Sequence, residues 1–205
     1  MIVAGGRGDR FGAPKQFSSV AGARLVDHAV AAAAAVCNEV VLVLPPGIEW
    51  DGSTVQAVVA GGPTRSGSVR AGLAAVAHDT EIVVVHDAAR PLATAALFEL
   101  VIDAVRAGAD AAVPALEVAD TLKRVDGDRV TDTVSRDMLV AVQTPQAFRA
   151  AALRAAHEHG DDATDDAALV EAAGGNVVIV AGDPRNLKVT TLADLALAET
   201  LLEAR

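Results

Sequence analysis

A glycine-dense segment near the start of the chain holds the first residues suited to chemistry. It follows the apolar residues 1–3 and contains, in order, Ala4, Gly5, Gly6, Gly8, Arg10 and Lys15. Glycines let backbone N–H groups approach phosphates closely, and the two cations add positive charge. The dinucleotide pattern G-x-G-x-x-G fails because Phe11 stands at its third glycine, and no P-loop Gly-Lys-Ser/Thr occurs. The segment therefore indicates a nucleoside triphosphate loop of another type.

Polar residues also follow a second apolar run. His86 and Asp87 come directly after residues 82–85, and Arg90 follows three residues later. Ligands of open α/β sheets bind at the carboxyl ends of strands, and a carboxylate there suits Mg²⁺, which takes oxygen ligands and phosphates. Asp87 is therefore a candidate Mg²⁺ ligand, with helix capping as the alternative. His86 is predicted to be structural, because neutral His is a poor Mg²⁺ ligand.

Two more groups of charged residues stand out. Lys188 lies in the extended run 186–190 and gains weight because the chain has only three lysines. Four aspartates have a spacing that suggests a metal cluster: Asp161, Asp162, Asp165 and Asp166. The favoured interpretation is a solvated loop that leads into a helix N-terminus, where negative charge is stabilising.

These residues need elements that bring them to one edge of a sheet. Apolar, β-branched runs predict buried strands at residues 40–44, 55–60, 82–85, 111–114 and 177–180. Ala-rich stretches predict helices at residues 25–37, 66–77, 94–107, 148–157 and 165–173, and Thr191 with Asp194 forms a capping-box pattern that opens a final helix. This alternation predicts an α/β fold with a doubly wound sheet.

Residues 117–138 break the alternation. Two β-prone, charged runs flank Asp126-Gly127, which is a strong hairpin signal. Because charged residues fill the segment, it is a poor candidate for the core. We predict that it forms a protruding β-arm.

Length and composition exclude several classes. The 205 residues favour one domain, residues 1–205, and 52% hydrophobic against 21% charged residues exclude a disordered chain. A net charge of −10 and 2% aromatic residues disfavour a nucleic-acid binder. Cys37 is the only cysteine, which excludes an internal disulfide. No apolar run approaches ~20 residues and no signal peptide is evident, so we expect a soluble, cytoplasmic protein without a membrane partner.

Several motifs together resemble the 2-C-methyl-D-erythritol 4-phosphate cytidylyltransferase family over almost the whole chain. They are the glycine-dense segment with Pro14-Lys15-Gln16, Gly61-Gly62 with Arg65 and Ser68, His86-Asp-Ala-Ala-Arg90-Pro91, Asp120-Thr121-Leu-Lys123, Gln143-Thr144-Pro-Gln146, Thr164-Asp165 and Asn186-Leu-Lys188-Val-Thr190. The first motif alone indicates only a nucleotidyltransferase of the sugar-nucleotide pyrophosphorylase type. The later motifs are far more specific.

The resemblance implies a Rossmann-like, mostly parallel α/β domain with helices on both faces, whose β-arm embraces the partner in a homodimer. It implies transfer of CMP from CTP to 2-C-methyl-D-erythritol 4-phosphate with Mg²⁺, releasing pyrophosphate. By position, Arg10, Lys15 and Lys188 would be catalytic, and Asp87 would hold Mg²⁺. The nucleotide would contact Ala4, Gly5, Gly6, Gly8, Gly61, Gly62, Ser68 and Ala88. The polyol phosphate would contact Arg90, Thr121, Arg136, Thr144, Thr164 and Lys188.

Three departures from the family pattern bear on these roles. Pro63 follows Gly61-Gly62 and has no N–H, so a backbone donor expected there is lost. Ser135 precedes Arg136 where Asp is common. Arg185 stands where many members have Asp, which makes Asp183 a candidate second metal ligand.

Two alternatives stay open. A cytidylyltransferase for another polyol phosphate, such as ribitol 5-phosphate, would share the loop and differ at the acceptor residues Thr121, Arg136 and Thr164. A non-catalytic nucleotide-binding module is the other alternative. It is disfavoured because a sensor needs no clamp on the α-phosphate.

Overall fold

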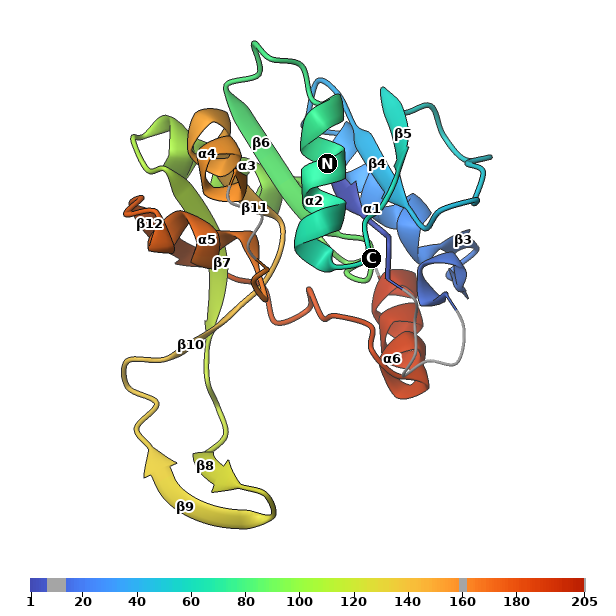
Figure 1. Ribbon diagram of the computed structural model, residues 1–205. Helices are drawn as coiled ribbons and strands as arrows, with labels where there is room; N and C mark the ends of the chain where they lie inside the picture. Colours follow the sequence, from blue (N-terminus) through green and yellow to red (C-terminus); the bar gives the residue numbers. More distant parts are fainter. Residues whose placement is uncertain (7–13, 159–161, 205) are drawn as a thin grey trace.

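The computed structural model describes residues 1–6, 14–158 and 162–204. They form an α/β body from which one long arm extends (Figure 1). Gly8, Arg10 and Asp161 lie outside the described residues, so the predictions made for them stay predictions. Within the described ranges, no helix has both the length and the hydrophobicity needed to cross a membrane.

The described residues form a central sheet of eight strands. Its order is β10-β7-β11-β6-β1-β4-β5, with β12 beside β7. The bounds are β1 Ile2–Val3, β4 Val41–Leu44, β5 Ala57–Ala60, β6 Ile82–Asp87, β7 Ala111–Glu117, β10 Val140–Val142, β11 Gln146–Arg149 and β12 Val177–Ala181. Strand β1 is parallel to β4 and β6, β4 to β5, and β7 to β12, whereas β10 and β11 are antiparallel to their neighbours. The mostly parallel sheet is confirmed.

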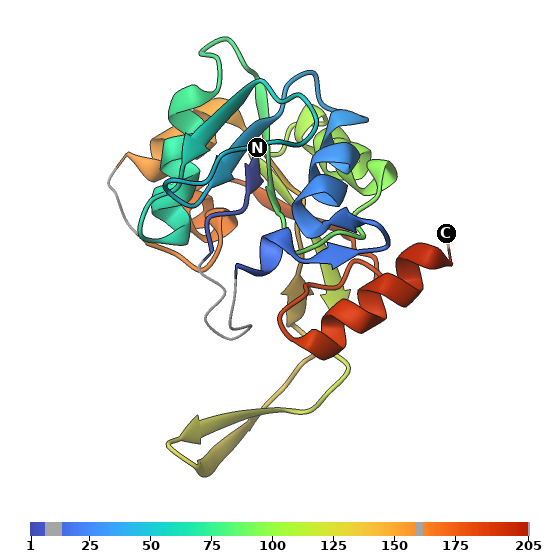
Figure 2. The same cartoon turned by 90° about the vertical axis from the view of Figure 1, so that its right-hand side faces the viewer.

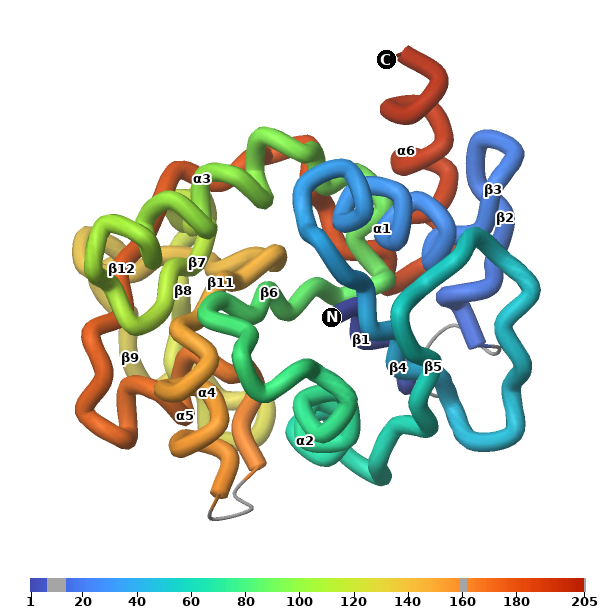
Figure 3. The backbone as a smooth tube through the Cα atoms, turned by 90° about the horizontal axis from the view of Figure 1, so that it is seen from above, coloured from blue at the N-terminus to red at the C-terminus, as the bar shows by residue number. Residues whose placement is uncertain are grey.

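Helices cover both faces of this sheet (Figure 3). Their bounds are α1 Leu25–Ala34, α2 Arg65–Ala75, α3 Ala95–Arg106, α4 Ala150–His157, α5 Asp166–Ala172 and α6 Leu192–Glu203. Leu42 and Leu44 pack into a core with α1 and α3, whereas Val41 and Val43 pack into a second core with α2, α4 and α5. Successive strand residues point to opposite faces, so a sheet covered on both faces needs continuous apolar strands.

The parallel strands bring their carboxyl ends to one edge of the sheet. Gly61 follows β5, Asp87 ends β6, and the chain after β12 continues into the run that holds Lys188. Strand β7 ends at the same edge and leads into the arm (Figure 1). Residues far apart in sequence therefore meet there, as expected for ligand sites in open α/β folds.

The arm is a hairpin of β8, Leu122–Asp126, and β9, Arg129–Val134, and its side chains are mostly exposed. The hairpin prediction is confirmed, but its turn is displaced by one residue. Asp126 still pairs with Arg129, so the two loop residues are Gly127 and Asp128, and only Gly127 has a positive φ, +59°. Glycine at the first loop position is typical of a type II′ turn.

A third, smaller cluster attaches the C-terminal helix. Val20 of the hairpin β2 Ser19–Val20 and β3 Ala23–Arg24 packs with Val189 and Ala198. Figure 2 shows α6 beside this hairpin. Thr191 caps α6 by accepting a hydrogen bond from the Asp194 backbone N–H, and Asp194 closes the predicted capping box. Val189 is thereby buried, which places its neighbour Lys188 at the sheet edge.

Tertiary packing overrides the sequence pattern in three places. The predicted helix at 148–157 begins only at Ala150, because Phe148 lies in β11 and pairs with Val83 and Ala111. The predicted buried strand at 55–60 is the edge strand β5, in which Val58 is exposed. The predicted buried strand at 177–180 is β12, which among the described strands pairs only with β7 at the other edge of the sheet and in which Ile179 is exposed. The other predicted helices and strands are confirmed with small changes in their ends.

Candidate active site

A cavity of about 880 Å³ opens at the carboxyl edge of the sheet. Its described lining residues include Ala4, Gly5, Gly6, Lys15, Gly61, Gly62, Arg65, Ser68, Asp87, Ala88 and Lys188. Three of the lining side chains are cations, Lys15, Arg65 and Lys188, and one is an anion, Asp87. A chain of net charge −10 thus concentrates positive charge in one cavity. Such a cavity attracts anionic ligands.

The glycine-dense segment enters and leaves the cavity wall at fixed points. The Gln16 amide donates to the carbonyls of Ala4, at 2.7 Å, and Gly6, at 3.1 Å, and thereby ties the two ends of the segment together. Lys15 begins the short 3₁₀ helix η1, Lys15–Phe17, and its Nζ donates to the Val189 carbonyl at 2.8 Å. The Lys15 ammonium is therefore held against the run that carries Lys188.

The Ser68 hydroxyl lies between the backbones of Gly5 and Gly61. A Cβ on Gly5 would lie 3.0 Å from Ser68 Oγ, and one on Gly61 would lie 2.8 Å from it. A Cβ on Gly62 would meet the Gly67 backbone at 2.7 Å. Close backbone packing thus requires glycine at Gly62, and a side chain at Gly61 would displace the Ser68 hydroxyl. Ser68 Oγ donates to the Thr64 carbonyl at 2.9 Å, which leaves its oxygen lone pairs as acceptors.

Asp87 lies between two cations. Lys188 Nζ donates to Asp87 Oδ2 at 2.6 Å, and Arg65 Nε lies 3.5 Å from Oδ1. Burial alone would raise the pKa of Asp87, but the Lys188 ammonium and the Arg65 guanidinium outweigh burial and lower this pKa to about 2. The carboxylate is therefore ionised at neutral pH.

His86 holds the backbone at Asp87 in place through Thr144. Its ring is fully buried, and burial lowers its pKa to about 4, so it is neutral at pH 7. Nε2 donates to the Arg90 carbonyl at 3.1 Å, which leaves Nδ1 to accept from Thr144 Oγ1 at 3.0 Å. Thr144 Oγ1 in turn accepts from the Asp87 N–H at 3.0 Å. The structural role predicted for His86 is confirmed.

Two buried amides hold the run that carries Lys188. Gln143 Nε2 donates to the Asp183 carbonyl at 2.9 Å, and Asn186 Nδ2 donates to the Thr144 carbonyl at 2.9 Å. Arg90 then donates to the Asn186 carbonyl at 2.7 Å. The Asp183 carboxylate accepts from the Arg185 N–H at 2.8 Å and does not belong to the described cavity lining.

The aspartates at and before the start of α5 make different contacts. Asp165 is the N-cap of α5 and accepts from the Ala168 N–H, as a helix-leading residue should. Asp162 is exposed and accepts from Thr64. Asp166 contradicts the prediction of a solvated loop, because its side chain is 0% exposed. It lies 2.7 Å from Arg65 NH1 and 3.0 Å from His157 Nε2, so docking of α5 against α2 and α4 buries it with two partners.

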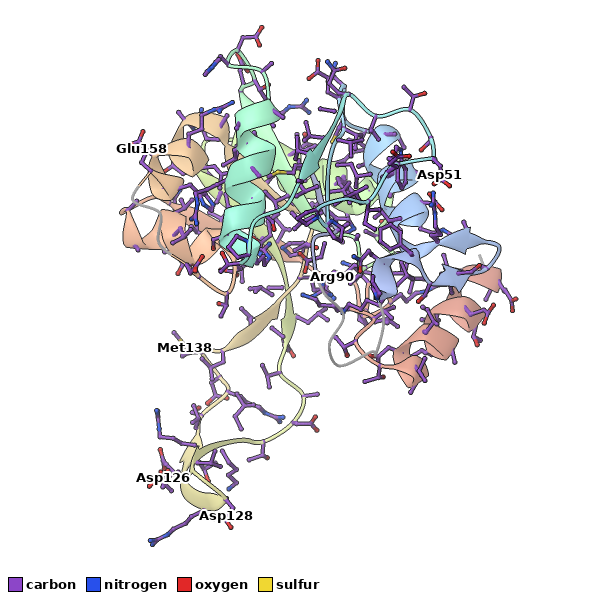
Figure 4. The ribbon with its side chains drawn as sticks, turned by 45° about the vertical axis from the view of Figure 1, so that its right-hand side comes forward. Asp51, Arg90, Asp126, Asp128, Met138 and Glu158 are labelled. Carbon is purple, nitrogen blue, oxygen red and sulfur yellow. The ribbon has the colours of Figure 1, made fainter. Side chains whose placement is uncertain are left out.

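Five predicted substrate residues lie apart from the described cavity lining. Thr144 is buried in the hydrogen bonds described above, and Thr164 is exposed just before α5. Arg90 lies on the side of the body from which the arm extends (Figure 4). Thr121 and Arg136 lie in the arm, where the Arg136 guanidinium donates to the Val118 and Ala119 carbonyls. One chain alone therefore does not bring these two residues to its own cavity lining.

The donor set at Asp87 fits a magnesium ion that arrives with phosphates. Among the described residues, no three His, Cys, Asp or Glu side chains gather in an arrangement suited to a metal. Mg²⁺ is often held by only one or two carboxylates together with substrate phosphates and water. Asp87 is ionised, lines the cavity and has lone pairs beyond the two directed at cations. A single carboxylate therefore suffices.

The family model of 2-C-methyl-D-erythritol 4-phosphate cytidylyltransferase (IspD) matches residues 1–204. The chain belongs to this family. It is 48% identical to the 2-C-methyl-D-erythritol 4-phosphate cytidylyltransferase of Nocardia farcinica, over 100% of this chain and 94% of that protein. It is 45% identical to the enzyme of that name from Deinococcus radiodurans, over 98% and 88% of the two chains.

A solved structure agrees with this family assignment. The crystal structure of the Thermus thermophilus protein of that name superposes with a TM-score of 0.87 and 37% identity, over 98% of this chain and 97% of the other. The resemblance that the motifs indicated is confirmed, and so is the α/β fold that it implied. The likeness extends over nearly the whole chain.

Sequence reasoning left three residues of the site without a role. Arg65 appears in the Gly61-Gly62 motif, but its position between Asp87 and Asp166 depends on how α2 packs. His157 and Asp166 lie nine residues apart on separate helices, and their pairing depends on the loop between α4 and α5. A pair of His and Asp at this spacing carries no sequence signal of contact.

Proposed function

We infer that this chain transfers CMP from CTP to 2-C-methyl-D-erythritol 4-phosphate, giving 4-diphosphocytidyl-2-C-methyl-D-erythritol and pyrophosphate. Family membership supports the reaction. The observation that carries it in this molecule is the convergence of Lys15, Arg65 and Lys188 around Asp87 in one cavity. Two anionic phosphates must meet for this reaction, and fixed cations lower the repulsion between them.

The cavity wall at Ser68 suits the cytosine base. The single Ser68 hydroxyl proton is directed at the Thr64 carbonyl, so the oxygen faces a ligand as an acceptor. The exocyclic amino group of cytosine is a donor, whereas uracil has a carbonyl at the same position. Gly5 and Gly61 bring their backbones close to this oxygen. An acceptor at this position favours CTP over UTP.

The chemistry needs positioning and charge stabilisation more than covalent help. An oxygen of the acceptor phosphate attacks the α-phosphorus of CTP. The bond from this phosphorus to the oxygen that bridges to the β-phosphate breaks, and pyrophosphate leaves with the electron pair. Lys15 and Lys188 line the cavity and supply charge to the phosphates. Arg10 would add to this charge from the glycine-dense segment.

Asp87 would hold Mg²⁺, which when bound supplies charge neutralisation at the phosphates. Thr144 and His86 keep the Asp87 carboxylate in position for this task. Thr144 accepts a hydrogen bond from the Asp87 N–H and donates one to His86, so the end of β6 keeps one orientation. Thr144 is thus a positioning residue in this account, and its predicted contact with the polyol phosphate remains a prediction.

The acceptor side requires a second copy of the chain in our proposal. Val125, Val130 and Met138 of the arm are 58%, 55% and 92% exposed. A two-stranded hairpin is marginal by itself, and apolar side chains on it are stabilised when another surface covers them. We propose a homodimer in which Thr121 and Arg136 reach the partner's cavity. Arg90 and Thr164 would complete the acceptor site.

The cytoplasmic location stays a prediction, which cell fractionation would test.

The rate of pyrophosphate release tests this function. The enzyme is incubated with CTP, Mg²⁺ and one polyol phosphate at a time: 2-C-methyl-D-erythritol 4-phosphate, ribitol 5-phosphate or erythritol 4-phosphate. We expect the fastest release with the first. Faster release with ribitol 5-phosphate would indicate a different acceptor, and no release with any acceptor would indicate a non-catalytic nucleotide-binding module.

A further inference from the structure

The Arg65 guanidinium is shared between two carboxylates. NH1 donates to Asp166 Oδ2 at 2.7 Å, whereas Nε lies at the longer distance of 3.5 Å from Asp87 Oδ1. Asp87 and Asp166 both raise the pKa of Arg65 against the effect of its burial, so the side chain is a permanent cation at this point. The closer of its two partners is the one outside the described cavity lining.

Asp166 is built as a rigid anchor for this guanidinium. Its side chain is fully buried, and His157 Nε2 donates to its other oxygen at 3.0 Å. His157 is itself buried, and its Nδ1 has no hydrogen-bond partner among the described residues. Ser66 Oγ accepts from the Ala163 N–H at 3.1 Å, which ties the segment before α5 to the start of α2. A buried charge pair with this support has little freedom to rearrange.

Because Lys188, Arg65 and a metal ion would all bind the Asp87 carboxylate, the position of Arg65 affects metal binding. Lys188 already donates to Asp87 Oδ2 at 2.6 Å, so Oδ1 is the oxygen that Lys188 does not occupy. A guanidinium in direct contact with Oδ1 would oppose a divalent cation there by charge repulsion and by occupying lone pairs. With its NH1 hydrogen-bonded to Asp166 and its Nε 3.5 Å from Asp87 Oδ1, Arg65 forms a close contact with Asp166 rather than with that oxygen.

We propose that Asp166 is a positioning residue for the reaction, which together with His157 holds Arg65 away from Asp87 and so keeps an Asp87 oxygen for the metal–nucleotide complex. This inference rests on the proposed function, in which Asp87 holds Mg²⁺. Asp166 touches neither nucleotide nor metal in this account. It acts through Arg65 alone.

The test is a double-mutant cycle on metal-assisted nucleotide binding, measured without turnover. Calorimetry gives the Kd of CTP with Mn²⁺ and with EDTA, and the ratio of the two is the factor by which Mn²⁺ tightens CTP binding. We expect Asp166→Asn to reduce this factor at least about fivefold, because Arg65 then pairs with Asp87. In the Arg65→Gln background, Asp166→Asn should leave the factor nearly unchanged, since no guanidinium remains to compete.

The cycle separates positioning from a simple loss of nearby charge. If Asp166 acted only through the electrostatic field of its charge, Asp166→Asn would reduce the Mn²⁺ tightening of CTP binding equally in the wild-type and Arg65→Gln backgrounds. That result would overturn the proposal. An unchanged factor in Asp166→Asn would also overturn it. Asp166→Ser provides a second variant if Asp166→Asn folds poorly, with the same two expectations.

Arg154→Lys is the matched control. Arg154 links α4 to the end of α2 through the carbonyls of Leu73, Val76 and Ala77 and does not belong to the described cavity lining. It should lower the melting temperature and leave the Mn²⁺ factor unchanged. If Mn²⁺ does not tighten CTP binding to the wild type, this inference fails. Pyrophosphate release by the wild type decides the proposed function independently.

Discussion

Replacement of Lys188 by Gln removes the ammonium that lies 2.6 Å from the Asp87 carboxylate. The pKa of Asp87 is about 2 instead of its ordinary 3.8, which corresponds to about 2 kcal/mol of net favourable interaction in the folded state. Arg65 supplies part of this, and Lys188 is 43% exposed, so solvent screening reduces its share. We expect the variant to lose about 1 kcal/mol of folding stability at pH 7.

The stability difference should depend on pH with a definite sign. Folding lowers the pKa of Asp87, so the stabilisation is fully present above about pH 4 and is lost as the pH falls through about 2. The melting temperatures of wild type and variant should differ by about 2–4 °C at pH 7 and converge in strong acid. Thermal unfolding followed by circular dichroism between pH 2 and 7 measures this.

Activity should fall far more than stability. A fixed charge directed at the developing charge of the transition state is worth about 10²–10³ in rate, so kcat/KM for pyrophosphate release should fall by that factor. Arg106→Gln is the control, because it removes an exposed cation on α3 that pairs only with Asp103 among the described partners. If Lys188→Gln retains more than about half of the wild-type kcat/KM while its melting temperature falls, the ion pair is structural and the reasoning is refuted.

Three further predictions follow from the same cavity. Lys15→Ala should reduce kcat/KM about 10²–10³-fold, yet shift the melting temperature by only a few degrees, because a hydrogen bond such as the one to Val189 contributes only about 1 kcal/mol to stability; activity above about half of wild type would contradict its role. The wild type should prefer CTP over UTP by more than about 10²-fold in kcat/KM, and Ser68→Ala should narrow this preference; equal rates in the wild type would contradict the base site. Co-expressed Arg136→Ala and Lys15→Ala chains should recover about half of the wild-type activity per heterodimer, since one of its two shared sites carries neither change; dimers that stay inactive would place Arg136 in its own chain's site.

Local sequence pattern accounts for the parts of the fold that depend on short-range signals. Continuous apolar runs predicted β4 and β6 because a sheet covered on both faces leaves those strands no polar side, whereas the same kind of run in β12 lies at an edge with Ile179 exposed. The Thr191 capping box and the hairpin at Gly127 are likewise local chemistry. Asp87 was found because ligands bind at the carboxyl ends of parallel strands, and Lys188 because the chain has only three lysines.

The remaining features depend on contacts between distant segments. Phe148 has an Ala-rich C-terminal neighbourhood typical of a helix, but pairing with Val83 and Ala111 makes it part of a strand. Asp166 has the setting of a solvated helix N-terminus, and only the docking of α4 and α2 reveals it as a buried partner of Arg65. The spacing of residues along the chain predicts neither contact.

³¹P NMR of the wild-type enzyme with CTP, Mg²⁺ and 2-C-methyl-D-erythritol 4-phosphate tests the transfer of CMP most directly. We predict that the three CTP resonances and the polyol phosphate resonance decline together. Pyrophosphate and a coupled pair of diphosphate resonances from the cytidyl product should rise in equal amounts. Unchanged CTP under these conditions, or its conversion to CDP and inorganic phosphate with the polyol phosphate untouched, would contradict this transfer.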